Sequence, residues 1–194
     1  IGAAIGGYFV FTDGFTIAII LGFAILSIYF YSTKIVDSGL GEFFVAVKGS
    51  MIVIGTIFIQ SGQITLESIL AGIIVGSLSS LVLFIVSFPD HDADKSKGRK
   101  TLVIVVGKQN AVKLFWVFPL ISYCAILIGV ALELFPIISL ISFIGIPLMI
   151  KSGLGLKKNY DSVDELVPYM ASTLMFSRIT GVLFVISFLI PLLQ

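Results

Sequence analysis

The chain has 194 residues, of which 58% are hydrophobic and only 12% are charged, and its mean hydropathy is +1.14. This balance excludes an ordinary soluble domain and predicts an integral protein of a lipid bilayer. The formal net charge of +1 says little by itself, because the location of charge matters more than its sum in a membrane protein, and no nucleic-acid partner is expected.

Seven apolar segments fill most of the chain. Lipid forces each segment to satisfy its own backbone hydrogen bonds, and runs such as SSLVLFIVSF do not alternate as barrel strands would. The sequence therefore predicts an all-α fold: a polytopic transmembrane helical bundle of seven helices, forming a single membrane-embedded domain over residues 1–194. The segments cover residues 1–12, 15–33, 43–60, 65–88, 111–132, 135–151 and 170–193.

The first segment is short for a membrane span. Residues 1–12 would form about 18 Å of helix, whereas the hydrocarbon core is about 30 Å thick. The chain opens with IGAAIGGYFVF, without Met and without the basic region and cleavage site of a signal peptide. We expect an N-terminal portion of the protein to precede this segment.

Basic residues are confined almost entirely to alternate connections between the segments. The connections near Asp13, Gln60 and Glu133 carry no Lys or Arg. By the positive-inside rule the opposite side is cytoplasmic, which predicts a multi-pass protein of the cell membrane with residues 87–102 on the cytoplasmic side. That side holds ten of the twelve basic residues: Lys34, Lys95, Lys97, Arg99, Lys100, Lys108, Lys113, Lys151, Lys157 and Lys158.

The other two basic residues, Lys48 and Arg178, fall inside predicted helices. Each is expected about two turns from the cytoplasmic end, so that its side chain could extend to the interface. Ionisable residues within membranes also commonly face polar cavities. Both are therefore candidate substrate-binding residues.

The stretch SFPDHDADKSKGRKTL, residues 87–102, is the most charged part of the chain. An EF-hand is excluded because Lys95 and Thr101 stand where Gly and Glu are required. A zinc site is excluded because the chain has one His and one distant Cys. A solvated loop beside anionic lipid remains the simplest alternative.

Magnesium fits this stretch better, because it takes one or two carboxylates and completes its shell with waters and substrate phosphate oxygens. If residues 90–94 are helical, Asp90 and Asp94 share a face and Asp92 points nearly opposite. The pattern predicts Mg²⁺ at Asp90 and Asp94 and a polyprenyl diphosphate substrate whose tail lies in the membrane. The cations that could bind its phosphates are Lys97, Arg99 and Lys100.

The predicted chemistry is ionisation of an allylic C–O bond in a cavity that excludes water. Tyr29 and Tyr31, at the end of the second segment, could stabilise the allylic cation with their ring faces. Tyr31 is therefore a catalytic candidate, although interfacial tyrosines are also ordinary membrane anchors.

The stretch PDHDADKSKGRKTLVIVVGK resembles the second aspartate-rich motif of the UbiA superfamily of intramembrane prenyltransferases. YSTKIVDSGLGEF resembles the family's loop two helices earlier, and the resemblance extends over essentially the whole chain. It implies Mg²⁺ and diphosphate binding by Asp90 and Asp94 and phosphate contacts by Lys97 and Lys100. Lys34 stands three residues after Tyr31, not four as in the family's Y-x-x-x-K motif.

Family members have nine transmembrane helices, and a first motif, N-D-x-x-D-x-x-x-D, follows their second helix. This sequence has no such motif. The resemblance therefore implies that the seven segments correspond to helices 3–9, and that the domain as given lacks the first two helices and the first aspartate-rich motif. It also implies that this fragment alone is inactive.

The GLGE turn, the spacing to IQSGQ and the G-R-K-T-L ending are most similar to 1,4-dihydroxy-2-naphthoate polyprenyltransferases of menaquinone synthesis. This similarity implies a small aromatic acceptor. Archaeal geranylgeranylglyceryl phosphate prenyltransferases, with a glycerophosphate acceptor, remain an alternative.

Two alternatives come from other classes of protein. A polytopic transporter would place its acids near the bilayer midplane, but nearly all acids here lie at helix ends. A head-group transferase of another fold would show D-G-x-x-A-R, which is absent. The last basic connection, KSGLGLKKNYDSVDELVPYM, is expected to be a solvated loop; the alternative is a short helix from Ser162 that caps the cavity.

Overall fold

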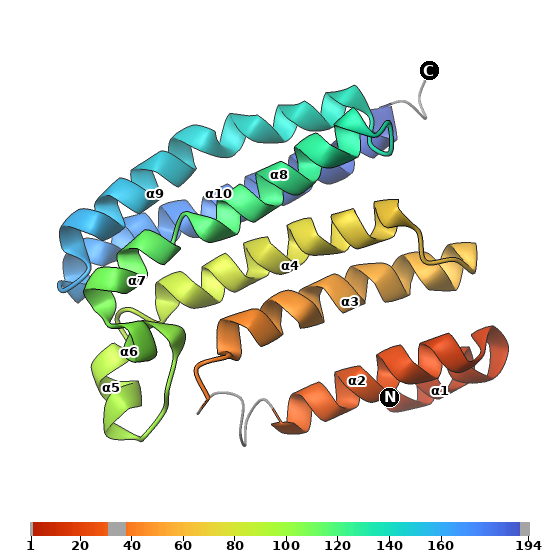
Figure 1. Ribbon diagram of the computed structural model, residues 1–194, viewed down its shortest axis with the longest axis horizontal. Helices are drawn as coiled ribbons and strands as arrows, with labels where there is room; N and C mark the ends of the chain where they lie inside the picture. The colour runs from red at the N-terminus through yellow and green to blue at the C-terminus, as the bar shows by residue number, and fades with distance from the viewer. Residues whose placement is uncertain (1, 31–37, 191–194) are drawn as a thin grey trace.

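The computed structural model describes residues 2–30 and 38–190, and within these ranges the chain forms helices and no strand (Figure 1). In chain order the helices are α1 (Gly2–Asp13), α2 (Phe15–Phe30), α3 (Gly41–Ser61), α4 (Leu66–Val86), α5 (His91–Ser96), α6 (Leu102–Val106), α7 (Lys108–Leu114), α8 (Val117–Ala131), the 3₁₀ helix η2 (Ile137–Gly145), α9 (Ile146–Asn159) and α10 (Val163–Leu189).

Within the described residues, each of the seven predicted apolar segments forms helix, which confirms the prediction of an all-α polytopic bundle. In the described part of the chain, five spans are long and apolar enough to cross a membrane. Helices α1 and α2 are shorter and lie side by side at one edge of the bundle in Figure 1. The five spans are Gly41–Ser61, Leu66–Val86, Lys108–Ala131, Ile137–Asn159 and Val163–Leu189.

The turn between α3 and α4 is specified by local chemistry. Helix α3 ends at Gly62, whose φ of 71° is in the left-handed region that favours glycine. Helix α4 begins with a reciprocal cap in which Thr65 Oγ1 accepts from the Ser68 N–H and Ser68 Oγ accepts from the Thr65 N–H. The two spans therefore run antiparallel through a tight turn.

Helices α3 and α4 approach closely because small residues line their contact. A Cβ atom at Gly76 would collide with the Ala46 carbonyl oxygen and the Ser50 hydroxyl. Ser50 Oγ lies 2.9 Å from the Gly72 carbonyl oxygen, to which it can donate across the interface. Without a hydrophobic driving force in lipid, such close packing and interhelical hydrogen bonds hold membrane helices together.

Helix α4 lies at the centre of the bundle and contacts α3, α8 and α10. Its buried Ser77 is paired with a neighbouring helix, because Ser77 Oγ lies 2.5 Å from Ser122 Oγ of α8. This position places the end of α4, and the charged stretch that follows it, at the middle of one end of the bundle. The large buried side chains of α4 are Ile74, Leu81, Phe84 and Ile85.

The last connection differs from the prediction. Helix α9 continues to Asn159 and α10 starts at Val163, so there is no separate short helix from Ser162 and the last span starts before residue 170. Pro168 lies within α10, near its start, and the acids of the first turn favour the helix N-terminus. Since α10 starts earlier, Arg178 lies about 22 Å along it, not two turns from its end.

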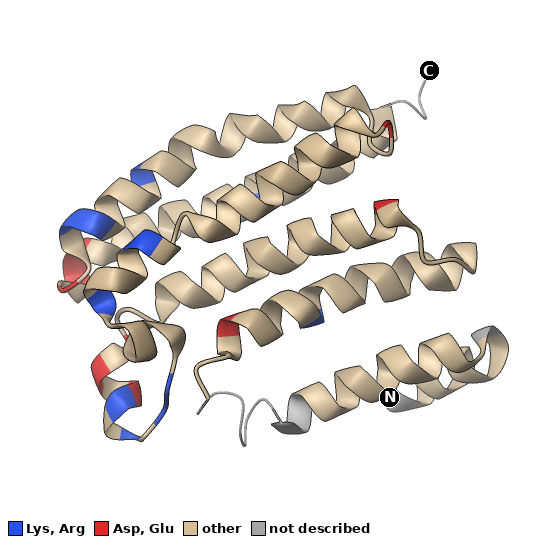
Figure 2. Cartoon of the chain, viewed as in Figure 1, with Lys and Arg blue, Asp and Glu red and all other residues tan. Residues whose placement is uncertain are grey.

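Lys and Arg gather at the end of the bundle that carries α5, α6 and α7 (Figure 2). The last helix, α10, ends at the opposite end of the bundle (Figure 1). The grouping of basic residues at one end is therefore confirmed, and the cytoplasmic location of that end remains a prediction.

Candidate functional site

Helix α5 puts two acids of the charged stretch on one face. Phe88 is buried and anchors the end of the preceding span, and the chain then turns into α5. The Asp94 N–H donates to the Asp90 carbonyl oxygen at 2.8 Å, so the two residues lie one helical turn apart. Asp90 is exposed, and its side chain makes no capping hydrogen bond. The helical geometry assumed for residues 90–94 is therefore present.

Arg99 holds Asp94 in place. Its guanidinium Nη1 donates to Asp94 Oδ1 at 3.0 Å, and its backbone N–H donates to the Asp94 carbonyl oxygen at 3.0 Å. The Asp94 side chain is only 14% exposed. Arg99 was predicted as a phosphate ligand, and in the structure its guanidinium is engaged by the carboxylate that it orients.

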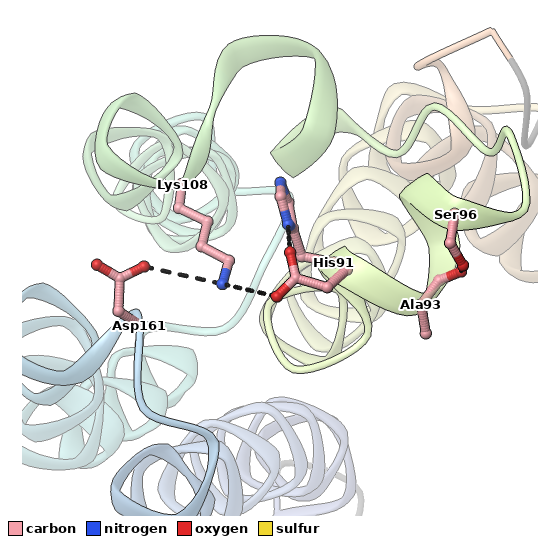
Figure 3. Close-up of polar contacts among 6 residues, drawn as sticks. His91, Ala93, Ser96, Lys108 and Asp161 are labelled. Carbon is pink, nitrogen blue, oxygen red and sulfur yellow. Dashed lines mark hydrogen bonds and ion pairs between the residues drawn. The ribbon is translucent and has the colours of Figure 1, made fainter.

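Asp92 points to a different set of partners. Its carboxylate accepts a hydrogen bond from His91 Nδ1 at 2.7 Å and lies 4.0 Å from Lys108 Nζ, which lies 3.8 Å from Asp161 Oδ1 (Figure 3). The His91 hydrogen bond, followed by the charge of Lys108, lowers the pKa of Asp92 from its usual value. Asp92 thus stays ionised at neutral pH, and Lys108 links α5 to the connection before α10.

The Lys108→Gln variant is expected to loosen this link without unfolding the bundle, because Asp92 and Asp161 are exposed and ion pairs to exposed carboxylates contribute little stability. Amide hydrogen exchange in residues 91–96 should become about twofold to fivefold faster. The matched control is Lys113→Gln, since Lys113 forms no ion pair in the described part of the chain. Equal amide exchange rates of residues 91–96 in the two variants would contradict a link between α5 and Asp161 through Lys108.

The remaining candidate cations lie in different places. Lys97 and Lys100 are exposed after α5 and form no ion pair within residues 38–190. Lys48 is exposed on α3, and Arg178 is exposed on α10 beside a small apolar hollow. Neither Lys48 nor Arg178 lines the large cavity that is described next. Tyr31 and Lys34 lie outside the described residues, as does the side chain of Tyr29.

A cavity of about 550 Å³ opens between α3, α4 and α8 and reaches Leu102 at the start of α6. Because Leu102 is the last residue of the charged stretch, the cavity begins two residues after Lys100 in the sequence. Its walls are mainly aliphatic and aromatic, which suits a hydrocarbon chain. Its lining includes Phe43, Val47, Met51, Leu114, Phe118 and Ile121.

Glu42 is a functional candidate that sequence reasoning missed. It lines this cavity from the first turn of α3, is only 2% exposed, and neither carboxylate oxygen has a hydrogen-bond partner among the described residues. Its sequence signal is the acid that closes the GLGE turn at the start of an apolar run.

The GLGE turn is fixed against α6. Gly39 has a φ of 79°, and a Cβ atom there would stand 2.8 Å from Val105 Cγ2 and 3.5 Å from the Lys100 carbonyl oxygen. This contact brings the turn before α3 beside the end of the charged stretch, although the two segments are about 60 residues apart in the sequence. The described end of the earlier UbiA-like segment, at Gly39, therefore meets the later UbiA-like segment.

The carboxylates partly fit a magnesium ion. Asp90 and Asp94 provide two oxygen-bearing side chains on one face, which is the usual protein contribution to a Mg²⁺–diphosphate site. No group of three or more His, Cys, Asp or Glu side chains within the described residues could hold a metal by itself. Further ligands would therefore come from the phosphates and from groups outside the described residues.

Comparison with known proteins gives a consistent result. Residues 1–177 match the UbiA prenyltransferase family. A 75-residue part of the chain is 37% identical to 1,4-dihydroxy-2-naphthoate octaprenyltransferase of Bacillus subtilis (strain 168), covering 38% of this chain and 24% of that protein. No solved structure matches the chain. Because the family match covers most of its length, this chain belongs to the UbiA prenyltransferase family.

Proposed function

We propose that this protein transfers a polyprenyl group from an allylic diphosphate to a small aromatic acceptor in menaquinone-type quinone biosynthesis. The observation that carries the proposal is that α5 presents two carboxylates on one face and that Leu102, at the end of the same charged stretch, lines an apolar cavity. The similarity to a naphthoate octaprenyltransferase supports an aromatic acceptor. The end of the bundle that carries α5 faces the cytoplasm in this proposal.

In the proposed site, Asp90 and Asp94 hold Mg²⁺, and Lys97 and Lys100 bind the phosphates of the substrate. Bound Mg²⁺ supplies positive charge that favours departure of the diphosphate. Arg99 keeps the Asp94 carboxylate oriented through its 3.0 Å hydrogen bond. These residues form one side of the proposed site. In this proposal residues 1–194 belong to a single membrane-embedded domain.

The bond changes in the proposed reaction are simple. The allylic C–O bond breaks, its electron pair leaves on the diphosphate, and a ring carbon of the acceptor bonds to the resulting allylic cation. That carbon then loses the group that it carried, either a proton or its carboxylate as CO₂, so that the ring regains its aromaticity. The apolar cavity holds the prenyl chain and excludes water that would otherwise capture this cation.

The acceptor is identified by incubating the full-length protein with Mg²⁺, a polyprenyl diphosphate, and either 1,4-dihydroxy-2-naphthoate or geranylgeranylglyceryl phosphate. We expect mass spectrometry to detect a prenylated naphthalene product only in the first reaction. Product in the second reaction alone would instead support a lipid-forming prenyltransferase. Absence of both products would contradict the proposal.

Glu42 is expected to bind a hydroxyl group of the acceptor, because it is a buried carboxylate at the wall of the cavity and no donor in the described part of the chain is bonded to it. Glu42→Gln should raise the acceptor KM about tenfold or more, since a charge-assisted hydrogen bond is weakened, and leave the KM for prenyl diphosphate unchanged. The variant should also be at least as heat-stable as the wild type, because it removes an unpaired buried charge.

Steady-state kinetics with each substrate varied in turn, together with a thermal melt, checks this expectation. Ser50→Ala is a suitable control because Ser50 lines the same cavity but is paired with backbone carbonyl oxygens. An unchanged acceptor KM in Glu42→Gln would leave Glu42 with no part in acceptor binding.

A further inference from the structure

A second cavity, here called the α7–α9 cavity, lies between α7 and α9 at the end of the bundle where basic residues gather. Its volume is about 420 Å³, and its walls are far more polar in character than those of the large cavity. It is lined by Gln109, Val112, Lys113, Trp116, Lys157 and Tyr160. None of these residues was assigned to the proposed prenyltransferase site.

The two lysines that line this cavity have no anionic partner. Lys113 comes from α7 and Lys157 from the last turn of α9, and neither forms an ion pair or side-chain hydrogen bond within the described residues. Asp161, an acid close to Lys157 in the sequence, is 3.8 Å from Lys108. Two ammonium groups around one cavity repel each other unless an anion lies near both. The cavity therefore favours a ligand with negative charge.

Aromatic side chains place the cavity at the depth of lipid headgroups. The Trp116 ring lies against the backbone of α9, because a Cβ atom at Gly153 would collide with it. Trp116 is 36% exposed, and Tyr160 is partly buried in the same wall. Trp and Tyr with apolar rings and polar tips are enriched at membrane interfaces.

Exposed leucines continue each lysine-bearing face toward the membrane. Leu120 of α8 is 62% exposed and follows Lys113 of α7 by seven residues, and Leu154 is 58% exposed and precedes Lys157 by one turn of α9. An exposed leucine therefore follows each lysine away from the basic end, on α9 for Lys157 and on the adjoining helix α8 for Lys113. A soluble anion would contact only the two lysines, whereas an amphiphile would contact both the lysines and the exposed leucines.

We propose that the α7–α9 cavity binds the phosphate headgroup of an anionic phospholipid. Lys113 and Lys157 contact the phosphate from two helices, the Trp116 ring lies beside the glycerol region, and the acyl chains run along Leu120 and Leu154. Basic pockets between membrane helices on the cytoplasmic side are suited to such headgroups. The site is separate from the carboxylates of α5 and does not depend on the proposed enzyme activity.

Trp116 provides a direct probe, because it is the one Trp of the 194-residue sequence and lines the cavity. The full-length protein is reconstituted into phosphatidylcholine vesicles that contain a small fraction of brominated phosphatidylglycerol or brominated phosphatidylcholine. Bromine quenches indole fluorescence at contact distance. Subtracting the fluorescence of a Trp116→Phe variant isolates the contribution of Trp116.

We expect brominated phosphatidylglycerol to quench Trp116 more strongly than brominated phosphatidylcholine at the same mole fraction. Each lysine contributes about fivefold to this preference, so Lys113→Gln/Lys157→Gln should reduce it roughly 25-fold, to the level of the neutral lipid. The control Lys151→Gln/Lys158→Gln removes the same charge from α9 outside the cavity and should retain the preference.

Three results would overturn the proposal. The first is equal quenching by the two brominated lipids in the wild type. The second is an equal loss of preference in the control variant, which would indicate general surface charge. The third is full reversal of the quenching by millimolar inorganic phosphate or glycerol phosphate, which would assign the cavity to a soluble anion.

Discussion

Replacing Asp94 by Asn in the full-length protein is expected to abolish diphosphate release, lowering kcat/KM by roughly 10²- to 10⁴-fold. Asn preserves the size of the side chain but removes the negative charge that Mg²⁺ requires, and it loses the charge-assisted contact with Arg99. Asp90→Asn should have a similar effect, because Asp90 lies one turn away on the same face of α5. Both variants should insert into membranes normally. A coupled diphosphate assay measures the loss.

Asp92→Asn is the matched control for these variants. Asp92 is 86% exposed, and its partners are His91 and Lys108. Asp92 lies in the same helix and carries the same charge, but its side chain is on the opposite face from Asp90 and Asp94. We expect a loss of no more than several-fold. Wild-type turnover in Asp94→Asn, or equal losses in all three variants, would contradict a metal site on one face of α5.

The Gly76→Ala variant is expected to lose about 2–3 kcal/mol of stability, as overpacking of a tight helix contact does. The new Cβ atom would collide with the Ala46 carbonyl oxygen, which belongs to the backbone of α3 and cannot move away as a flexible side chain could. Since α4 lies at the centre of the bundle, separating it from α3 would also widen the large cavity between them. Reversible unfolding in mixed micelles measures this change.

Gly181→Ala in α10 is the control for the glycine prediction. A Cβ atom there would meet no atom within 4 Å, so the better helix propensity of Ala should leave stability unchanged or raise it by up to about 1 kcal/mol. If both variants are equally stable, close packing at Gly76 does not hold α3 and α4 together.

The sequence was sufficient for those features that depend on local pattern. Hydropathy located the seven helical segments, because lipid requires each of them to satisfy its backbone hydrogen bonds internally. The distribution of Lys and Arg predicted that basic residues gather at one end of the bundle (Figure 2). The i,i+4 spacing of Asp90 and Asp94 predicted a shared helical face, and α5 provides it. Resemblance to the UbiA superfamily was confirmed by the family match.

Features that depend on how helices pack could not be predicted. Lys108 and Asp161 are separated by more than 50 residues, and only the packing of α7 beside α9 brings them to 3.8 Å. The burial of Glu42 accompanies the packing of α3 against α4, and Leu102 at the start of α6 lines the same cavity. The early start of α10 was missed because its first turn carries Asp164 and Glu165 and Pro168 follows, so hydropathy placed the span later. As a consequence Arg178 lies deeper than predicted.

The most direct test of the proposed site measures binding of a non-hydrolysable prenyl thiodiphosphate to the full-length protein by titration calorimetry, with and without Mg²⁺. We predict binding that requires Mg²⁺, is retained in Asp92→Asn, and is lost in Asp90→Asn and Asp94→Asn. Binding that is independent of Mg²⁺, or that is unchanged in Asp94→Asn, would contradict the assignment of α5 as the diphosphate-binding element.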